Sequence, residues 1–217
     1  YLDISAGDRA SSPFIHMQGI LHSARRNGAH KLNGSLVVNR QQMLNPSNVD
    51  DYTKVLPTRN LTYAGSARYG YKNKYNLQFD FGYNGSERFD PSHRFGFFPS
   101  ISGAWNLNKE PFWKDSKLGD IFTMFKLRAS YGKSGNDDIG DQRFFYLSNV
   151  NLENSGAGAV FGTNNGYSRP GVTITSYPNP DISWEISKIS NYAVEFTLFN
   201  SIDFVGEYWT RKTSDIL

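Results

Sequence analysis

The feature that most limits the fold of this chain is a strict alternation of side chains in the stretch YKNKYNLQFDFGYNG, residues 71–85. From Tyr75 to Tyr83 every odd position carries a large apolar group, and every even position is polar or is glycine. A period of two is typical of a β-strand with one apolar and one polar face. Aromatic residues stand at both ends of the apolar face. The environment that this face contacts must account for their positions.

The same alternation recurs along the chain, whereas helical periodicity is nearly absent. The predicted strands lie at residues 15–21, 32–41, 61–71, 75–83, 97–107, 125–131, 192–198 and 202–210. The first of these fits least well, and the last is irregular because Val205 shares a face with Asp203. A short helical turn is expected around Pro111, between the fifth and sixth segments. The predicted fold class is therefore all-β.

The connections between these segments alternate in length. Short turns are expected at residues 26–30, 72–74 and 199–201, long polar stretches at 42–60, 84–94 and 134–183, and an intermediate link at 108–123. Fifty residues without regular structure are exceptional in a compact soluble domain. Outer-membrane barrels have short turns on one side, long loops on the other and aromatic girdles at both interfaces. The pattern favours a transmembrane β-barrel, with a soluble carbohydrate-binding β-sandwich and a passive porin as alternatives.

In a barrel wall the apolar face of each strand meets lipid and the polar face meets the lumen. Tyr71 and Tyr75 would then mark the inner interface, and Leu61 and Tyr83 the outer one. The residues predicted to face lipid are Tyr69, Tyr75, Leu77, Phe79, Phe81, Tyr83, Leu127 and Phe196. The residues predicted to face the lumen are Arg68, Gln78, Asp80, Arg128 and Glu195.

Composition agrees with wide, two-faced strands more than with a thick aliphatic core. Aromatic residues make up 15% of the chain, while all hydrophobic residues reach only 38%. Mean hydropathy is −0.54, and no segment approaches the roughly 18 consecutive apolar residues of a transmembrane helix. The net charge is +3, but basic and acidic residues are interspersed, so a nucleic-acid partner is not expected. The absence of cysteine excludes disulfides and thiolate metal sites.

Short motifs that bind phosphates, dinucleotides or metals in other proteins occur here only with the wrong residue spacing. Gly132-Lys133-Ser134 lacks the first glycine of a P-loop, and GAGAVFG at residues 156–162 lacks the third glycine of a dinucleotide-binding loop. We interpret the latter as a flexible loop. Asp137, Asp138 and Asp141 are carboxylates of the kind that Ca²⁺ prefers, but their spacing does not match an EF-hand, and a solvated loop is favoured over a Ca²⁺ site. No enzyme and no other cofactor are predicted.

Three blocks, in order, resemble one family. They are YNGSERFDPSHRFGFFPSISGAWNLNKEPFW (residues 83–113), KLRASYGKSGNDDIGDQRF (126–144) and NPDISWEISKISNYAVEFTLFNSIDFVGEYWTRKTSDIL (179–217). Together they are similar to the SusC/RagA-type TonB-dependent outer-membrane transporters of Bacteroidetes. Residues 1–60 resemble the family only in their general character and contain none of these blocks.

The resemblance implies a plugged, 22-stranded barrel of which residues 1–217 contribute about eight strands. It implies localisation in the outer membrane and active import of glycans or peptides. The implied partners are TonB and a SusD-like surface lipoprotein, and the latter would meet the long loops. We expect the plug domain and the TonB box to lie outside these residues. The five lumen-facing residues would then line the substrate path or bind the plug, or they would be hydrated residues of the wall with no further role.

Overall fold

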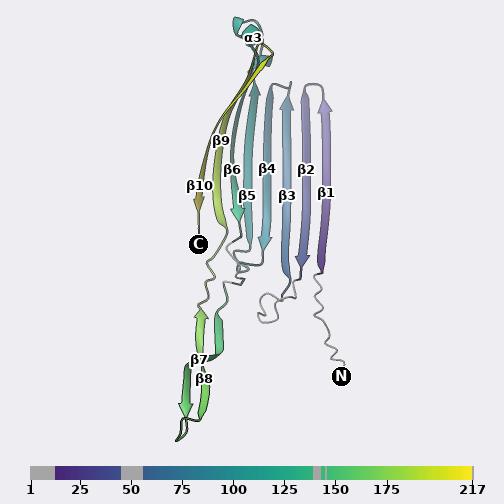
Figure 1. The fold of residues 1–217 in the computed structure, drawn as a ribbon. Helices are drawn as coiled ribbons and strands as arrows, with labels where there is room; N and C mark the ends of the chain where they lie inside the picture. The colour runs from purple at the N-terminus through teal and green to yellow at the C-terminus, as the bar shows by residue number, and fades with distance from the viewer. Residues whose placement is uncertain (1–12, 45–55, 139–142, 145, 217) are drawn as a thin grey trace, which may run out of the picture.

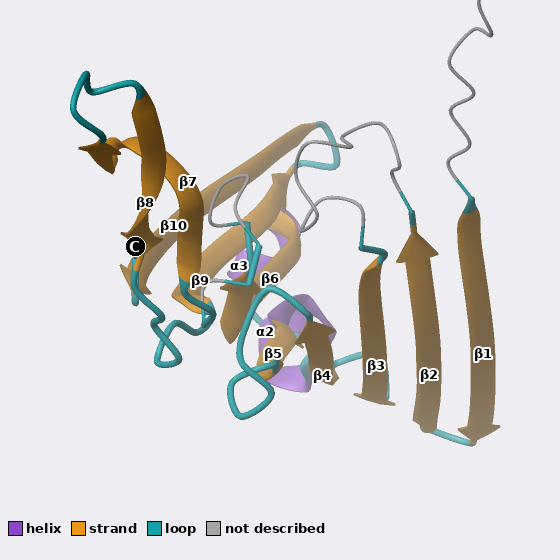
Figure 2. Ribbon diagram, turned by 90° about the horizontal axis from the view of Figure 1, so that it is seen from below, coloured by secondary structure: helices purple, strands orange, loops and turns teal. Residues whose placement is uncertain are grey.

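Eight strands form one antiparallel sheet in the computed structural model, which describes residues 13–44, 56–138, 143–144 and 146–216. They are β1 (Phe14–Asn27), β2 (His30–Met43), β3 (Thr58–Tyr71), β4 (Tyr75–Ser86), β5 (Phe95–Asn106), β6 (Phe122–Asn136), β9 (Glu185–Leu198) and β10 (Ile202–Ser214). Figure 1 shows them side by side in chain order, and Figure 2 shows that they follow a curved line. All eight predicted strands are present, the weakly patterned first one included.

The apolar face of this sheet is not covered by a second sheet in the described part of the chain. Leu77 keeps 51% of its surface exposed and Phe79 keeps 42%. The only other strands described, β7 and β8, pair with each other beyond one end of the sheet (Figure 1). A soluble sandwich buries one face of each sheet against the other. The described sheet therefore agrees with a barrel wall and gives the sandwich interpretation no support.

The connections at one end of the sheet are short, as predicted. The β3–β4 turn places Lys72 and Asn73 in the left-handed region with φ of 49° and 55°, and Phe199 and Asn200 between β9 and β10 repeat this with φ of 50° and 55°. Two consecutive left-handed residues suit the right-handed twist of paired strands. Asparagine tolerates this conformation better than most residues, so the Asn in each turn favours this turn type.

The fourth connection at the short-turn end holds the predicted helical turn. It contains η1 (Leu107–Lys109), α2 (Pro111–Lys114) and α3 (Lys117–Ile121). Among the described residues, no helix is long and apolar enough to cross a membrane. The link is fixed to the sheet because the Trp113 ring lies 4.9 Å from the Phe125 ring, centroid to centroid.

The segment 134–183, which the sequence predicts to lack regular structure, instead contains a hairpin of β7 (Asn149–Phe161) and β8 (Tyr167–Ser176). The loop interpretation of GAGAVFG is therefore wrong, because most of it lies in β7. A Cβ on Gly158 would lie 2.4 Å from the Arg169 carbonyl oxygen, and one on Gly171 would lie 2.0 Å from that of Ala157. The glycines thus permit a close, irregular strand pairing. Nearly every residue of the hairpin is exposed, and its apolar alternation is limited to the short runs Val150/Leu152 and Val172/Ile174.

Candidate substrate-facing surface

The strand register sorts the side chains of the sheet onto two faces. Residues directly opposite each other on paired strands share a face. One continuous row across five strands contains Arg68, Gln78, Ser102, Ser130 and Asn191. The next row along the strands, on the other face, contains Tyr69, Leu77, Gly103, Ala129 and Tyr192.

The residues predicted to face lipid and those predicted to face the lumen lie on opposite faces of the sheet. All eight residues predicted to face lipid lie on the face of Tyr69, and all five predicted to face the lumen lie on the face of Arg68. The separation of the two sets follows from the register. Contact with lipid or with a lumen stays a prediction.

Aromatic clusters stand at both ends of the apolar face. At the long-loop end, the Tyr83 ring stacks on Phe95 at 5.0 Å and lies 6.4 Å from Tyr63. At the short-turn end, Tyr75 stacks on Trp105 with centroids 6.2 Å apart. Such rings have an apolar body and, in Tyr and Trp, a polar tip, which suits a boundary between hydrocarbon and water. The positions of the aromatics in the sequence are thus matched by two belts across neighbouring strands.

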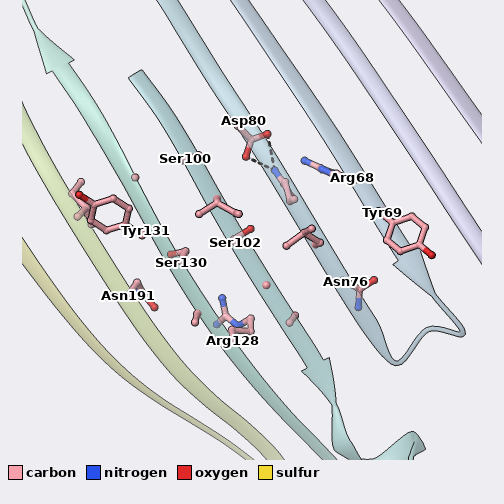
Figure 3. Close-up of a pocket in the computed structure, with 18 of the residues that line it drawn as sticks. Arg68, Tyr69, Asn76, Asp80, Ser100, Ser102, Arg128, Ser130, Tyr131 and Asn191 are labelled. Atoms are coloured by element: carbon pink, nitrogen blue, oxygen red, sulfur yellow. Dashed lines mark hydrogen bonds between the residues drawn. The ribbon is translucent and has the colours of Figure 1, made fainter. Parts of the chain in front are cut away.

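The polar face forms a shallow concavity of about 740 Å³ over the middle of the sheet (Figure 3). The Gln78 amide donates to both carboxylate oxygens of Asp80, at 2.9 and 2.7 Å. The Asn191 amide donates to Glu207 at 2.7 Å. Arg68 is exposed beside Gln78 and makes no ion pair within the described residues. Its guanidinium is thus available to an anionic or hydrogen-bond-accepting group.

A charged cluster occupies the same face nearer the short turns. The Lys126 ammonium lies 3.1 Å from the Glu195 carboxylate, and the Arg128 guanidinium forms a second ion pair with it. The Glu195 side chain is only 17% exposed, so the two cations keep a poorly solvated charge paired. Sequence reasoning identified Arg128 and Glu195 but missed Lys126. Only the pairing of β6 with β9 places Lys126 opposite Glu195.

Glu110 organises the short-turn end. Its buried carboxylate accepts hydrogen bonds from the Lys74 ammonium at 2.8 Å, the Tyr75 hydroxyl at 2.7 Å and the Trp105 indole at 3.1 Å. These donors stabilise the charged form and lower the pKa of Glu110 to about 2. Glu110 thereby ties the β3–β4 turn to β5, a role that its sequence position gives no sign of.

At the long-loop end, two connections pack together over the sheet. Phe89, Phe98 and Trp184 form the buried cluster of this region. The Trp184 indole donates to the Arg94 carbonyl at 3.3 Å. A Cβ on Gly135 would lie 2.0 Å from the tip of the Phe98 ring. The cluster fixes residues 87–94 against the segment that leads into β9, so this part of the long-loop end has a defined shape.

The acidic residues proposed as an alternative Ca²⁺ site are only partly described. Asp137 and Asp138 follow β6, and Asp138 lies 3.4 Å from the Arg88 guanidinium, while Asp141 lies outside the described residues. Among the described residues, no three His, Cys, Asp or Glu side chains form a group that could hold a metal ion. A Ca²⁺ site here therefore gains no support beyond residue type.

Comparison with known proteins places the chain in a family. No family model matches it. TonB-dependent receptor P26 of Formosa agariphila is 32% identical over 176 residues, which covers 74% of this chain and 16% of the receptor. TonB-dependent receptor SusC of Bacteroides thetaiotaomicron is 33% identical over 164 residues, with the same two coverages. The chain belongs to the SusC/RagA-type TonB-dependent receptors.

Solved structures support the same fold for this TonB-dependent receptor segment. The RagAB peptide transporter superposes with a TM-score of 0.68 at 18% identity, covering 95% of this chain and 24% of that one. The RagAB peptide importer in its "open-open" state gives a TM-score of 0.67 at 19% identity. The sheet is part of a transmembrane barrel of this family, whose members are transporters and not enzymes. The chain spans 16% of the length of the two curated relatives.

Proposed function

We propose that this protein forms part of the wall of an active importer in the bacterial outer membrane. On this proposal it takes up oligosaccharides or peptides with energy supplied through TonB, and a SusD-like lipoprotein covers the barrel mouth. The observation that carries the proposal is the sheet itself, with an uncovered apolar face bounded by aromatic belts and a polar face on the other side. In water such an apolar face would drive aggregation, whereas hydrocarbon accepts it.

Barrel closure requires further strands beside this sheet. β1 and β10 stand at its two edges, and backbone groups at an open edge cannot remain unpaired in hydrocarbon. We therefore assign residues 1–217 to the barrel domain, with the plug domain and the TonB box elsewhere in the full-length protein. A passive porin would have the same wall without these two parts.

The polar face supplies the groups that would meet substrate or plug. Arg68 has no ion-pair partner among the described residues, and the Gln78–Asp80 pair presents further hydrogen-bonding groups beside it. Hydroxyls of a glycan and carbonyls of a peptide are both acceptors for a guanidinium. The Glu195 carboxylate is already paired with Lys126 and Arg128, so this cluster is better suited to hold the wall than to select substrate.

Uptake by cells that carry the full-length transporter tests the proposal. Labelled peptides and labelled oligosaccharides are supplied separately, with and without TonB. We expect TonB-dependent uptake of one class, reduced by Arg68→Gln but not by the neighbouring, lipid-facing change Tyr69→Phe. Uptake that persists without TonB would indicate a passive pore. Recovery of the protein in aqueous buffer without detergent would exclude a membrane wall altogether.

The lipoprotein partner is tested separately. The full-length transporter is purified in detergent through an affinity tag, and the proteins that accompany it are identified. We expect a SusD-like lipoprotein in near-equal amount, held in part by the ordered long-loop end around Trp184. Trp184→Ala, which removes the centre of that packing, should reduce the amount recovered. Purification of the transporter alone under several detergents would contradict this part of the proposal.

A further inference from the structure

Three lysines form a row across neighbouring strands on the apolar face of the sheet. Lys133 on β6 lies directly opposite Lys188 on β9, and Lys188 lies directly opposite Lys212 on β10. The unbroken register from Tyr131 and Tyr192 places the lysines on the face of those two tyrosines. All three side chains are exposed, and within the described residues none makes an ion pair.

This arrangement is unfavourable unless an anion is present. Neighbouring strands lie about 4.8 Å apart, so the row is about 10 Å long. Like charges directly opposite each other destabilise a strand pair. No aspartate or glutamate shares this face on β6, β9 or β10 as the structure describes them. Within these three strands the row therefore has no counter-charge, and its three cations face the outside of the sheet.

The rows next to the lysines change in polarity step by step. Tyr131, Ser190 and Thr210 form the adjacent row toward the middle of the strands, and each carries a hydroxyl. Ser190 lies eight residues from the short-turn end of its strand, whereas Phe79 in the same register lies four residues from that end, so in tilted strands this row rises toward the long-loop end. The row after that contains Ala129, Tyr192 and Tyr208, and aromatic and aliphatic residues such as Phe204 follow. A membrane interface shows the same order from the headgroups to the acyl chains, with cations first, then hydroxyls and then aromatic rings.

We propose that Lys133, Lys188 and Lys212 bind the phosphate groups of an anionic lipid headgroup on the outside of the barrel. The hydroxyl row would donate to the same headgroup, and the acyl chains would lie over the aromatic row. The lysines stand at the long-loop end, which is the extracellular side of a barrel of this kind, so the lipid belongs to the outer leaflet. The inference rests on the membrane placement under the proposed function, but it does not depend on which nutrient is imported.

Native mass spectrometry of the full-length transporter tests the site. The protein is taken from phosphatidylcholine vesicles with or without a phosphorylated glycolipid of the lipid A type. The wild type should retain the glycolipid, and the triple variant Lys133→Gln, Lys188→Gln, Lys212→Gln should bind it about fivefold more weakly for each lysine removed. Arginine at the three positions should restore retention. A matched control replaces three exposed lysines at the short-turn end, Lys109, Lys114 and Lys117, by glutamine and should leave retention unchanged.

Other results would overturn the inference. Equal retention by the wild type and the triple variant would show that the row does not bind the headgroup. Retention of inorganic phosphate by the row in place of the glycolipid would make it a small-anion site. Heat-induced unfolding followed by gel mobility checks that the variants form barrels. The same variants are assayed for uptake. A variant that loses the glycolipid but keeps TonB-dependent uptake leaves the transport proposal intact. Absence of uptake in the wild type refutes the transport proposal but not the lipid site.

Discussion

Phe79 lies midway between the two aromatic belts of β4, and its replacement by arginine tests which solvent the apolar face meets. Tyr75 and Tyr83 are each four residues away, or about 14 Å along the strand. With the strand tilt usual in such barrels this gives about 10 Å of depth on each side, close to the middle of an apolar band about 25 Å tall. The residues opposite Phe79 are Ala67 and Ile101, so no carboxylate can pair with the new charge.

The expected penalty follows from that depth. Arginine at the midplane of a lipid-facing strand costs about 2–4 kcal/mol, so Phe79→Arg should be destabilised by that amount relative to Phe79→Ala. The matched control is Gln78→Arg, one residue away on the same strand and on the polar face. The new guanidinium can still donate to Asp80, but it stands directly opposite Arg68. The unfolding free energy should therefore fall by no more than about 1 kcal/mol, clearly less than the midplane penalty.

Guanidinium titration of the full-length barrel in phosphatidylcholine vesicles, followed by tryptophan fluorescence, measures these differences. Equal shifts for Phe79→Arg and Gln78→Arg would refute the assignment of faces. A penalty for Phe79→Arg no larger than that of Phe79→Ala would show that this face meets water. Either result would remove the physical basis of the membrane wall.

Three further changes probe the packing at the ends of the sheet. The pKa of Glu110 is lowered from 4.5 to about 2, so its stabilising effect is fully present above pH 4.5 and is lost as the pH falls toward 2. Acid titration of thermal unfolding should therefore show a larger loss of stability in the wild type than in Glu110→Gln. Gly135→Ala should destabilise by about 1–3 kcal/mol, because the new methyl group overlaps the buried Phe98 ring, and the additional change Phe98→Leu should relieve part of it in the same denaturation assay. Asn200→Gly should be tolerated at φ 55°, whereas Asn200→Val should cost about 1–2 kcal/mol; equal midpoints for the two variants would contradict the left-handed turn.

The hairpin of β7 and β8 shows where sequence patterning fails. Its strands are exposed on both sides, and a period of two is present only in short runs around Leu152 and Ile174. Glycine-rich composition, which ordinarily indicates a loop, here permits the close approach of Gly171 to the Ala157 carbonyl. Strand pairing depends on backbone groups, and these are invisible in a pattern of side chains.

The sequence by itself determined where the eight strands of the sheet lie and which side chains share a face, because alternation is a local property that each strand displays without its neighbours. It also indicated the tight turns at residues 72–74 and 199–201, where asparagine tolerates left-handed backbone. Only the tertiary structure decided which strands adjoin, and pairing β6 with β9 past an entire hairpin brings Lys126 to Glu195 across 69 residues. The same pairing aligns Lys133 with Lys188. Register between distant strands is fixed by the whole sheet, so ion pairs and charge rows across it exist only after folding.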